Sequence, residues 1–435
     1  NNLNFYFKKK KFEFSSFNKL TAFVMYAFST VFTITDNTFI KFLDLIFLFS
    51  GTSYLAYSVG AGKDKIERFL PFALLKSVFE YPFSKFDTYF SVSSESLKKT
   101  KSGSNIKLII IGLILGVPLT LIVGSLLMEA DDGMKNIINS IFSLDFMSDL
   151  FSWIWYLIIS IPLAAYIFGL LYRNVYRKDI NEVSEEKCLE SLNGLKFINN
   201  LVLYTAVTPV IILYIIFFIS QTSYFLSAFS GTLPEEFSYA VYARKGFFEL
   251  CFVAVINFAV IVFMNFTAKK CGNDKTSALK AYTIILSVST LILLAVAMSK
   301  MVMYISAYGL TQLRVYTTWF MLLCAFFFIL IIVKQFKTDF SMTKSIAVGF
   351  TLMFAVLCFS RPDAVIAKYN IDMYNNEKRA VLDESEIISL SDDSLLVAVD
   401  NGIISLDEAK EKSRINHDGD KLDGLNISTI ILNSK

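Results

Sequence analysis

The sequence has 435 residues, of which 54% are hydrophobic and 18% charged, with 43 Phe and a formal net charge of +3 at pH 7. Soluble domains are rarely so apolar, and so small a net charge does not indicate a nucleic-acid-binding protein. Apolar blocks long enough to cross a hydrocarbon core of ~30 Å alternate with short charged loops. The composition therefore predicts an all-α integral membrane helical bundle that has the lipid bilayer as its surroundings.

Nine apolar segments are long enough to span a bilayer, although several lie near the lower length limit. They cover residues 20–35, 43–59, 106–127, 150–171, 197–219, 247–266, 282–298, 316–333 and 346–360. The sequence starts at Asn1 rather than at a methionine, so further spans before this residue stay open. We expect about nine transmembrane helices in this sequence.

The Lys and Arg residues of the loops predict the orientation, because basic loops are retained in the cytoplasm. With the basic run at 8–11 inside, the inner segments hold 26 of these residues and the four short outer loops hold six. The opposite orientation would reverse this asymmetry. We therefore predict a basic cytoplasmic segment at 1–19, a transmembrane bundle at 20–360 and an extracytoplasmic C-terminal tail at 361–435.

The long inner loop at 60–107 alternates apolar with basic side chains, as in Ile66, Phe69 and Leu70 beside Lys65 and Arg68. This pattern is typical of an amphipathic segment that lies on the anionic lipids of the inner leaflet. An ordinary cytoplasmic loop packed under the bundle shows the same pattern. Both interpretations stay open.

Small residues follow one another at four-residue spacing in the third segment, at Gly112, Gly116, Thr120 and Gly124. Four small side chains on one helix face allow another helix to approach closely in lipid. The partner is either a neighbouring helix of the same chain or a second copy of the protein.

Polar side chains also recur on one face of the sixth segment. Glu249, Asn257 and Asn265 are separated by steps of eight residues, which keeps them on roughly the same side of a helix. Ionisable groups at membrane depth face the bundle interior and are functional candidates. An ion pair between Glu249 and Arg244 or Lys245 would instead be a structural anchor.

Charged residues from three stretches fall at the same predicted outer boundary. We expect a cluster there that acts either as a binding site or as a clamp between tail and bundle. Its members would be Arg244, Glu249, Arg314, Arg361 and Asp363.

The tail mixes acidic with apolar residues, and Ser405 followed by Glu408 forms a capping box. This pair predicts a helix that runs to about Arg414, within a small charged tail domain. The single histidine, His417, lies in the tail, and the five cysteines show no CxxC spacing. We therefore predict no catalytic residue, no metal site and no cofactor, and we rank a membrane enzyme last.

Three motifs in the second half are YARKGFFEL from Tyr242, YGLTQLRVY from Tyr308 and RPDAVIAKYN from Arg361. In this order they resemble an uncharacterised bacterial family of polytopic membrane proteins, a domain of unknown function. The resemblance implies a multi-pass protein of the bacterial cytoplasmic membrane. It implies no activity, substrate or catalytic residue.

Two classes of function remain after the enzyme is set aside. The first is a sensory or cell-envelope accessory protein that uses its external tail and works with a membrane partner. The second is a small-solute transporter or channel. A water-filled cavity at Asn257 would favour transport, whereas a packed interior would favour the accessory class.

Overall fold

The computed structural model describes residues 14–83, 145–176, 185–220, 247–269, 277–377, 381–417 and 426–435, and the single positions 112, 116, 120, 123, 127 and 133. Throughout these residues every extended element is a helix, which confirms the predicted all-α membrane bundle. The only strand-like pairing among the described residues is an isolated bridge between Ile198 and Ala268. The chain divides into two compact units, which are described one at a time.

The first unit contains residues 1–22, 49–65 and 71–182. Its described helices are the start of α2 (Ser16–Ser29), the end of α4 (Thr38–Gly60), most of α5 (Leu70–Leu75), the π-helical η1 (Lys76–Glu80), α6 (Tyr81–Phe83) and α10 (Asp145–Tyr176). Glycines allow these helices to approach closely, since a Cβ built on Gly169 of α10 would lie 2.1 Å from the carbonyl oxygen of Pro82.

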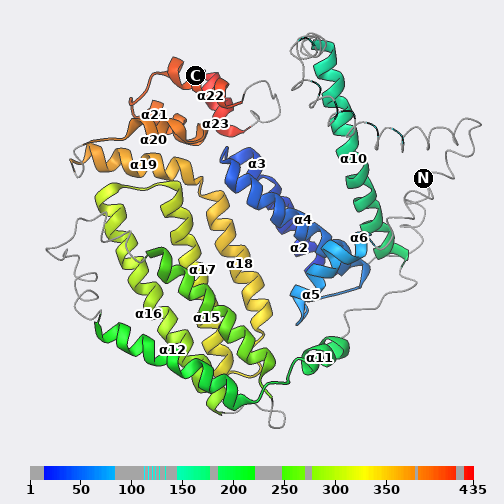
Figure 1. Cartoon of the computed structure of the whole chain (residues 1–435). Helices are drawn as coiled ribbons and strands as arrows, with labels where there is room; N and C mark the ends of the chain where they lie inside the picture. The colour runs from blue at the N-terminus through cyan, green and yellow to red at the C-terminus, as the bar shows by residue number, and fades with distance from the viewer. Residues whose placement is uncertain are drawn as a thin grey trace, which may run out of the picture. The chain divides into compact units, whose positions relative to one another are not determined.

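The second unit contains residues 23–48, 66–70 and 183–435. Its membrane helices are α12 (Asn200–Ser220), α15 (Phe247–Thr267), α16 (Ser277–Tyr308), α17 (Gln312–Phe336) and α18 (Met342–Phe359), preceded by the short α11 (Glu185–Gly194) (Figure 1). The core of these helices centres on α16, whose Leu286, Leu293 and Ala297 are at most 1% exposed. Many large hydrophobic side chains on the outside stay exposed, as expected for helices in contact with lipid.

An aromatic cluster joins the first helices of the chain to α18. The end of α2, the short α3 (Val31–Ile34) and the start of α4 pack on α18 through Phe28, Ile40 and Phe354. The rings of Phe28 and Phe354 stack with centroids 5.6 Å apart. This packing brings the connection between α3 and α4, residues 35–37, to the end of α18 from which the tail starts.

The tail is a small helical domain with its own apolar core. Its helices are α19 (Pro362–Asn375), α20 (Glu384–Ser389), α21 (Asp392–Asp400), α22 (Leu406–Asn416) and α23 (Ile427–Ser434). Ile371, Ile387, Leu395 and Leu432 are at most 1% exposed and pack together. The helix predicted from the capping box is confirmed, because Ser405 caps α22 and accepts a hydrogen bond from the backbone N–H of Glu408.

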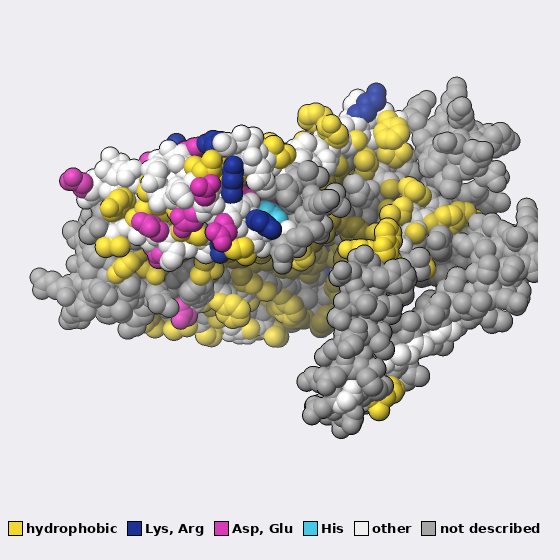
Figure 2. Space-filling model, turned by 90° about the horizontal axis from the view of Figure 1, so that it is seen from above, with side chains coloured by type: hydrophobic (Ala, Val, Ile, Leu, Met, Phe, Trp, Pro, Cys, Tyr) yellow, Lys and Arg dark blue, Asp and Glu magenta, His cyan; other side chains and the backbone are white. Residues whose placement is uncertain are grey.

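Seven described helices are long and apolar enough to cross a membrane. They coincide with seven of the nine predicted spans. The predicted span at 150–171 falls in α10, which has a shorter apolar part at Ile158–Asn174, whereas most of the predicted span at 106–127 lies outside the described residues. On the face seen in Figure 2, acidic and basic side chains lie close together, and hydrophobic side chains show beside them.

The inner loop at 60–107 is described only as far as residue 83. Residues 70–83 form a continuous helical stretch, and Pro71 falls at the second position of α5. This position suits proline because the first turn of a helix needs no hydrogen bond from its backbone nitrogen. The amphipathic character predicted for the remainder of the loop lies outside the described residues.

Candidate functional site

Four buried aspartates from three parts of the chain lie where the tail meets the bundle. We call Asp36, Asp363, Asp392 and Asp393 the aspartate cluster. Asp36 follows α3, Asp363 lies in the first turn of α19, and the other two open α21. Asp36 is 6% exposed and the other three are 0% exposed. A helix N-terminus favours a carboxylate, which explains three of the positions, but buried carboxylates still need partners.

Asp393 ties three segments together. Arg361 donates from Nη2 to Oδ1 of Asp393 at 3.0 Å, and Ser428 of α23 donates to the same oxygen. On the bundle side, Oδ2 accepts from Thr35 Oγ1 and from the backbone N–H of Asp36. Arg361 reaches this position because its backbone adopts a φ of 52° just before Pro362 starts α19.

Asp363 makes a second connection, with neutral partners. Its Oδ2 accepts from Asn37 Nδ2 at 2.8 Å and from Ser391 Oγ at 2.6 Å, and its Oδ1 accepts from Gln312 Nε2 at 2.8 Å. Asn37 also caps α4, because its Oδ1 accepts the backbone N–H of Ile40 at 2.9 Å. One asparagine therefore fixes both the start of α4 and the position of Asp363.

Asp36 lies between a lysine and the tail. Its Oδ1 accepts from Lys41 Nζ at 3.0 Å and from Asn426 Nδ2 at 2.9 Å, while its Oδ2 accepts the backbone N–H of Asp392 at 3.3 Å. Burial raises the pKa of the Asp36 carboxyl above its ordinary value. The Lys41 ammonium opposes this rise, and the neighbouring carboxylate of Asp392 adds to it.

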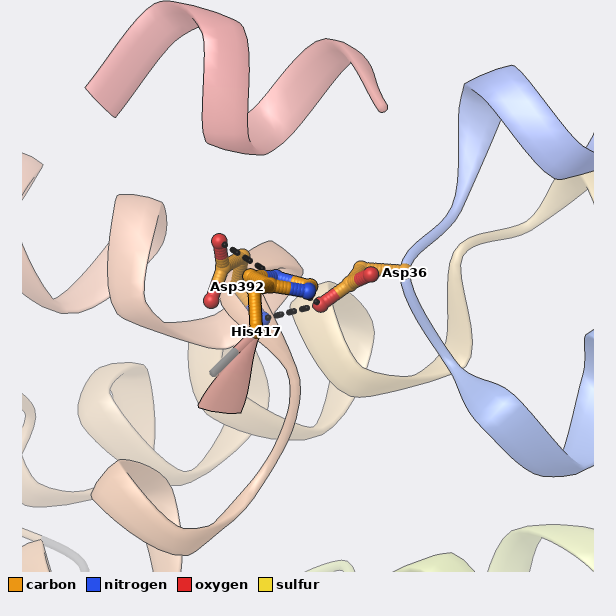
Figure 3. Close-up of side chains that lie close together, drawn as sticks. All are labelled: Asp36, Asp392 and His417. Atoms are coloured by element: carbon orange, nitrogen blue, oxygen red, sulfur yellow. Dashed lines mark hydrogen bonds and ion pairs between the residues drawn. The ribbon is translucent and has the colours of Figure 1, made fainter. Parts of the chain in front are cut away.

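His417, which ends α22, lies between Asp392 and Asp36 (Figure 3). Its Nε2 is 3.2 Å from Oδ2 of Asp392 and 3.4 Å from Oδ2 of Asp36. Oδ2 of Asp392 also accepts hydrogen bonds from the hydroxyls of Ser413 and Thr429. Oδ1 of Asp392 is buried and has no hydrogen-bond partner among the described residues.

Among the described residues, Asp36, Asp392 and His417 form the group that could hold a metal ion. One ligand atom from each of Asp36, Asp392 and His417 lies within 4.8 Å of the other two. Imidazole nitrogen and carboxylate oxygen are both ligands of divalent metal ions. The geometry can therefore bind a cation or, without one, form a hydrogen-bonded lock between tail and bundle.

Four of the five charged residues expected at the outer boundary are described, and they lie in different surroundings. Arg361 and Asp363 lie among the contacts between tail and bundle. Arg314 instead lies over the Tyr304 ring, 4.1 Å from its centroid, and donates to the carbonyl of Tyr308 at 2.9 Å. Glu249 is exposed at the start of α15. No hydrogen bond or ion pair joins Glu249, Arg314, Arg361 and Asp363 to one another.

Arg244, the fifth expected member, lies outside the described residues. Lys245 lies outside them too, so an ion pair of Glu249 with either residue stays a prediction.

Of the polar stripe of the sixth segment, Asn257 and Asn265 make hydrogen bonds to neighbouring helices, whereas Glu249 is exposed. Asn257 is 1% exposed, accepts from Tyr214 OH at 2.7 Å and donates to Thr290 Oγ1 at 2.8 Å. Asn265 donates to the carbonyl of Ile261 at 2.8 Å and to Thr283 Oγ1 at 3.2 Å. Both asparagines thus connect α15 to α16 by hydrogen bonds.

The small-residue face is only partly described. A Cβ built on Gly112 or Gly116 would meet no atom within 4 Å. Thr120 donates its hydroxyl to the carbonyl of Gly116 at 2.8 Å, and Gly124 lies outside the described residues. The helix that would pack on this face stays a prediction.

Four residues of the site were not predicted from the sequence as members of a common site: Asp36, Asp392, Asp393 and His417. The available local signals were the acidic pair directly after Ser391 and the Thr-Asp-Asn sequence between two apolar segments, both typical of helix starts. Neither signal shows that the two starts meet. His417 lies 25 residues from Asp392, with no repeated spacing to connect them.

Fold and site together define a polytopic membrane protein with a C-terminal helical domain fixed to its bundle by buried carboxylates. The chain belongs to the family described as a domain of unknown function, DUF4153, whose model matches residues 22–401. The match includes the four aspartates of the cluster and ends before His417. The chain matches no curated protein and no solved structure.

Proposed function

We propose that this protein is a sensory or accessory component of a bacterial cell envelope, in which the docked tail is the module that meets a partner or signal outside the cytoplasm. The observation that carries the proposal is the attachment of the tail. Three aspartates join the tail to the bundle by hydrogen bonds. In the tail, Asp393 accepts from Thr35 and Asp363 accepts from Asn37, while Asp36 accepts from Asn426 of the tail. An enclosed attachment of this kind can pass a change in the tail to the membrane helices.

The interior of the bundle supports the same proposal. Both polar atoms of the Asn257 amide are used by Tyr214 and Thr290. The surrounding Leu286, Leu293 and Met264 are at most 1% exposed. A solute pathway requires polar groups that face water, and Asn257 instead satisfies its hydrogen bonds within a packed core.

The orientation in the proposal rests on the Lys and Arg asymmetry of the loops. Contacts between loops agree with the alternation of the predicted spans. Leu310 of one predicted outer turn bonds Asn370 of the tail, and Thr343 of a predicted inner turn donates to the carbonyl of Arg68 in the inner loop. Binding of anionic lipids by the loop at 60–107 and association of two copies stay predictions.

A transporter or channel is the second candidate, and one observation favours it. Asp44 lies within α4, is 0% exposed, and neither of its carboxylate oxygens has a hydrogen-bond partner among the described residues. An ionisable side chain buried in a membrane helix is a candidate for carrying a proton or an ion.

Access of water to the interior separates the two candidates. In a variant with its five cysteines replaced by serine, Asn257→Cys and Ser287→Cys are introduced one at a time and treated in membranes with a small charged thiol reagent. If the protein is an accessory component, both cysteines should stay unmodified. Ile415→Cys should react, because the native Ile415 side chain is 61% exposed. Rapid modification at both interior positions would favour the transporter.

The partner of the tail is sought by photocross-linking in living cells. A photoreactive amino acid at Val381, which is 73% exposed on the tail, should give one protein product of constant mass. The matched position is Val356 on α18, which is 70% exposed on a membrane helix and should cross-link to lipid. Identical products from the two positions would contradict a specific role for the tail.

A further inference from the structure

We propose that Asp36, Asp392 and His417 bind a divalent transition-metal ion of the zinc type, and that this ion bridges the α3–α4 connection and the tail. The proposal adds a ligand to the tail attachment and does not depend on a sensory role. It rests on the positions of the ligand atoms, on the chemistry of the imidazole and on an unpaired buried oxygen.

The two distances from the imidazole nitrogen suit a tetrahedral ion. Zinc lies ~2.0–2.2 Å from nitrogen and oxygen ligands, so two ligands of a tetrahedral site are about 3.4 Å apart. Nε2 of His417 is 3.2 Å from the Asp392 oxygen and 3.4 Å from the Asp36 oxygen. Three protein ligands and an open fourth position are typical of zinc sites that bind a further ligand.

The imidazole cannot satisfy both carboxylates by hydrogen bonding. Nε2 carries at most one proton, and two carboxylate oxygens face it. A metal ion bound by the Nε2 lone pair would interact favourably with both oxygens at once. Nε2 and the two carboxylate oxygens can all bind one cation, whereas a single N–H cannot satisfy both oxygens.

The charges of the cluster lead to the same conclusion. Asp393 is paired with Arg361, and Asp36 is paired with Lys41. Asp392 is 0% exposed, its only cationic partner among the described ion pairs is His417, and its Oδ1 has no hydrogen-bond partner. A buried carboxylate without a countercharge is costly, and a divalent ion would provide the missing charge.

The surroundings also fit the support that metal ligands usually receive. Ser413 and Thr429 donate to Asp392, while Lys41 and Asn426 donate to Asp36. Such bonds hold ligating carboxylates in place. The ligands come from α21, from the end of α22 and from the α3–α4 connection, so a bound ion would join tail to bundle.

The first test uses the unaltered full-length protein. Because His417 is the only histidine, the protein is produced with ¹⁵N-labelled histidine and without a histidine tag. After purification it is treated with a chelator to remove bound metal. Zn²⁺ should bind at one ion per chain and shift the Nε2 resonance of the single imidazole. Ca²⁺ should have no such effect, because it requires six or more oxygen ligands.

The second test compares matched variants by equilibrium dialysis with Zn²⁺. His417→Gln and Asp392→Asn should each weaken binding by ~100-fold or more, since loss of even a supporting partner costs ~10–100-fold. The control is Asp400→Asn in the same helix as Asp392. The Asp400 side chain is 53% exposed and pairs with Lys435. This control should bind Zn²⁺ as the native protein does.

Two results would overturn the proposal. The first is an imidazole spectrum that does not change with excess Zn²⁺. The second is Zn²⁺ affinity that His417→Gln leaves unchanged. The imidazole experiment needs no substitution, so it remains decisive if Asp392→Asn fails to fold. Neither result would affect the cross-linking and accessibility tests of the proposed function.

Discussion

Asn370 and Leu310 exchange two hydrogen bonds between the tail and the bundle. Nδ2 of Asn370 donates to the carbonyl of Leu310 at 2.8 Å, and the backbone N–H of Leu310 donates to Oδ1 of Asn370 at 2.8 Å. Leu310 follows Gly309, whose φ of 76° makes the turn from α16 to α17. One side-chain amide therefore satisfies both backbone groups of a residue in that turn.

Removing this amide should loosen the tail. Asn370→Ala leaves two part-buried backbone groups without these partners, so we expect a loss of ~1–3 kcal/mol, measured as a lower Tm of the protein in detergent. Asn376→Ala is the control, because Asn376 is exposed and donates only to Asp372 in the same helix. Equal shifts for the two variants would show that the paired bonds contribute little.

Arg361 and Asp393 should be energetically coupled. We expect the double-mutant cycle of Arg361→Gln and Asp393→Asn to give a coupling of about 1 kcal/mol or more, because Asp393 is fully buried and Arg361 is its ion-pair partner. The control cycle combines Glu249→Gln with Arg314→Gln, which do not touch, and should be additive within ~0.5 kcal/mol. Additivity in the first cycle would contradict the bridge.

The membrane helices could be predicted from sequence because their signal is local. A block of apolar residues specifies a spanning helix wherever it occurs in the chain, and Ser405 with Glu408 specifies the start of α22. The contacts of the candidate site have no such local signal. Asp36 and Asp392 are separated by 356 positions and meet because the tail helices α19 and α23 pack on α17 and α3.

The pairing of charged side chains likewise has no local signal in the sequence. Membrane depth alone placed Arg314 and Arg361 at one boundary, but depth does not give the direction of a side chain around its helix. Arg314 stacks on Tyr304, within its own turn, and Arg361 faces Asp393. Only the packing of the tail determines these directions.

Close packing of helices is expected at Gly169. Gly169→Ala would place a methyl group 2.1 Å from the backbone carbonyl of Pro82, which cannot move without shifting α6. We expect a cost of ~1–3 kcal/mol, measured as thermal stability in detergent. Gly116→Ala should be tolerated, because its Cβ meets no atom within 4 Å. A similar loss at Gly116 would indicate a partner helix on the small-residue face.

The orientation can be tested with single cysteines in the cysteine-free protein. Ile415→Cys on the tail should react with a membrane-impermeant maleimide added outside cells whose outer barrier is open. Thr338→Cys, in the exposed turn between α17 and α18, should react only after the cells are lysed. Labelling in the reverse order would invert the predicted topology.

Two fully buried aspartates should respond oppositely to the same substitution. Asp363 accepts hydrogen bonds from Asn37, Gln312 and Ser391. Asp44 is equally buried, at 0% exposure, but its carboxylate has no hydrogen-bond partner among the described residues. A buried polar group that makes no bonds costs ~1–3 kcal/mol in proteins, whereas one that is satisfied stabilises the fold.

Asp363→Asn should therefore lower the Tm, because an amide places donor hydrogens where the carboxylate accepts bonds. Asp44→Leu should raise it, since Asp44 adjoins the apolar cluster of Phe28, Ile40 and Phe354. The increase should reach ~1–3 kcal/mol, reduced by any strain from the larger side chain. A stabilised Asp44→Leu protein that has lost its role in the cell would show that this costly carboxylate is kept for function, in favour of the transport candidate. A clear loss of stability would show instead that the carboxylate has a partner in the membrane.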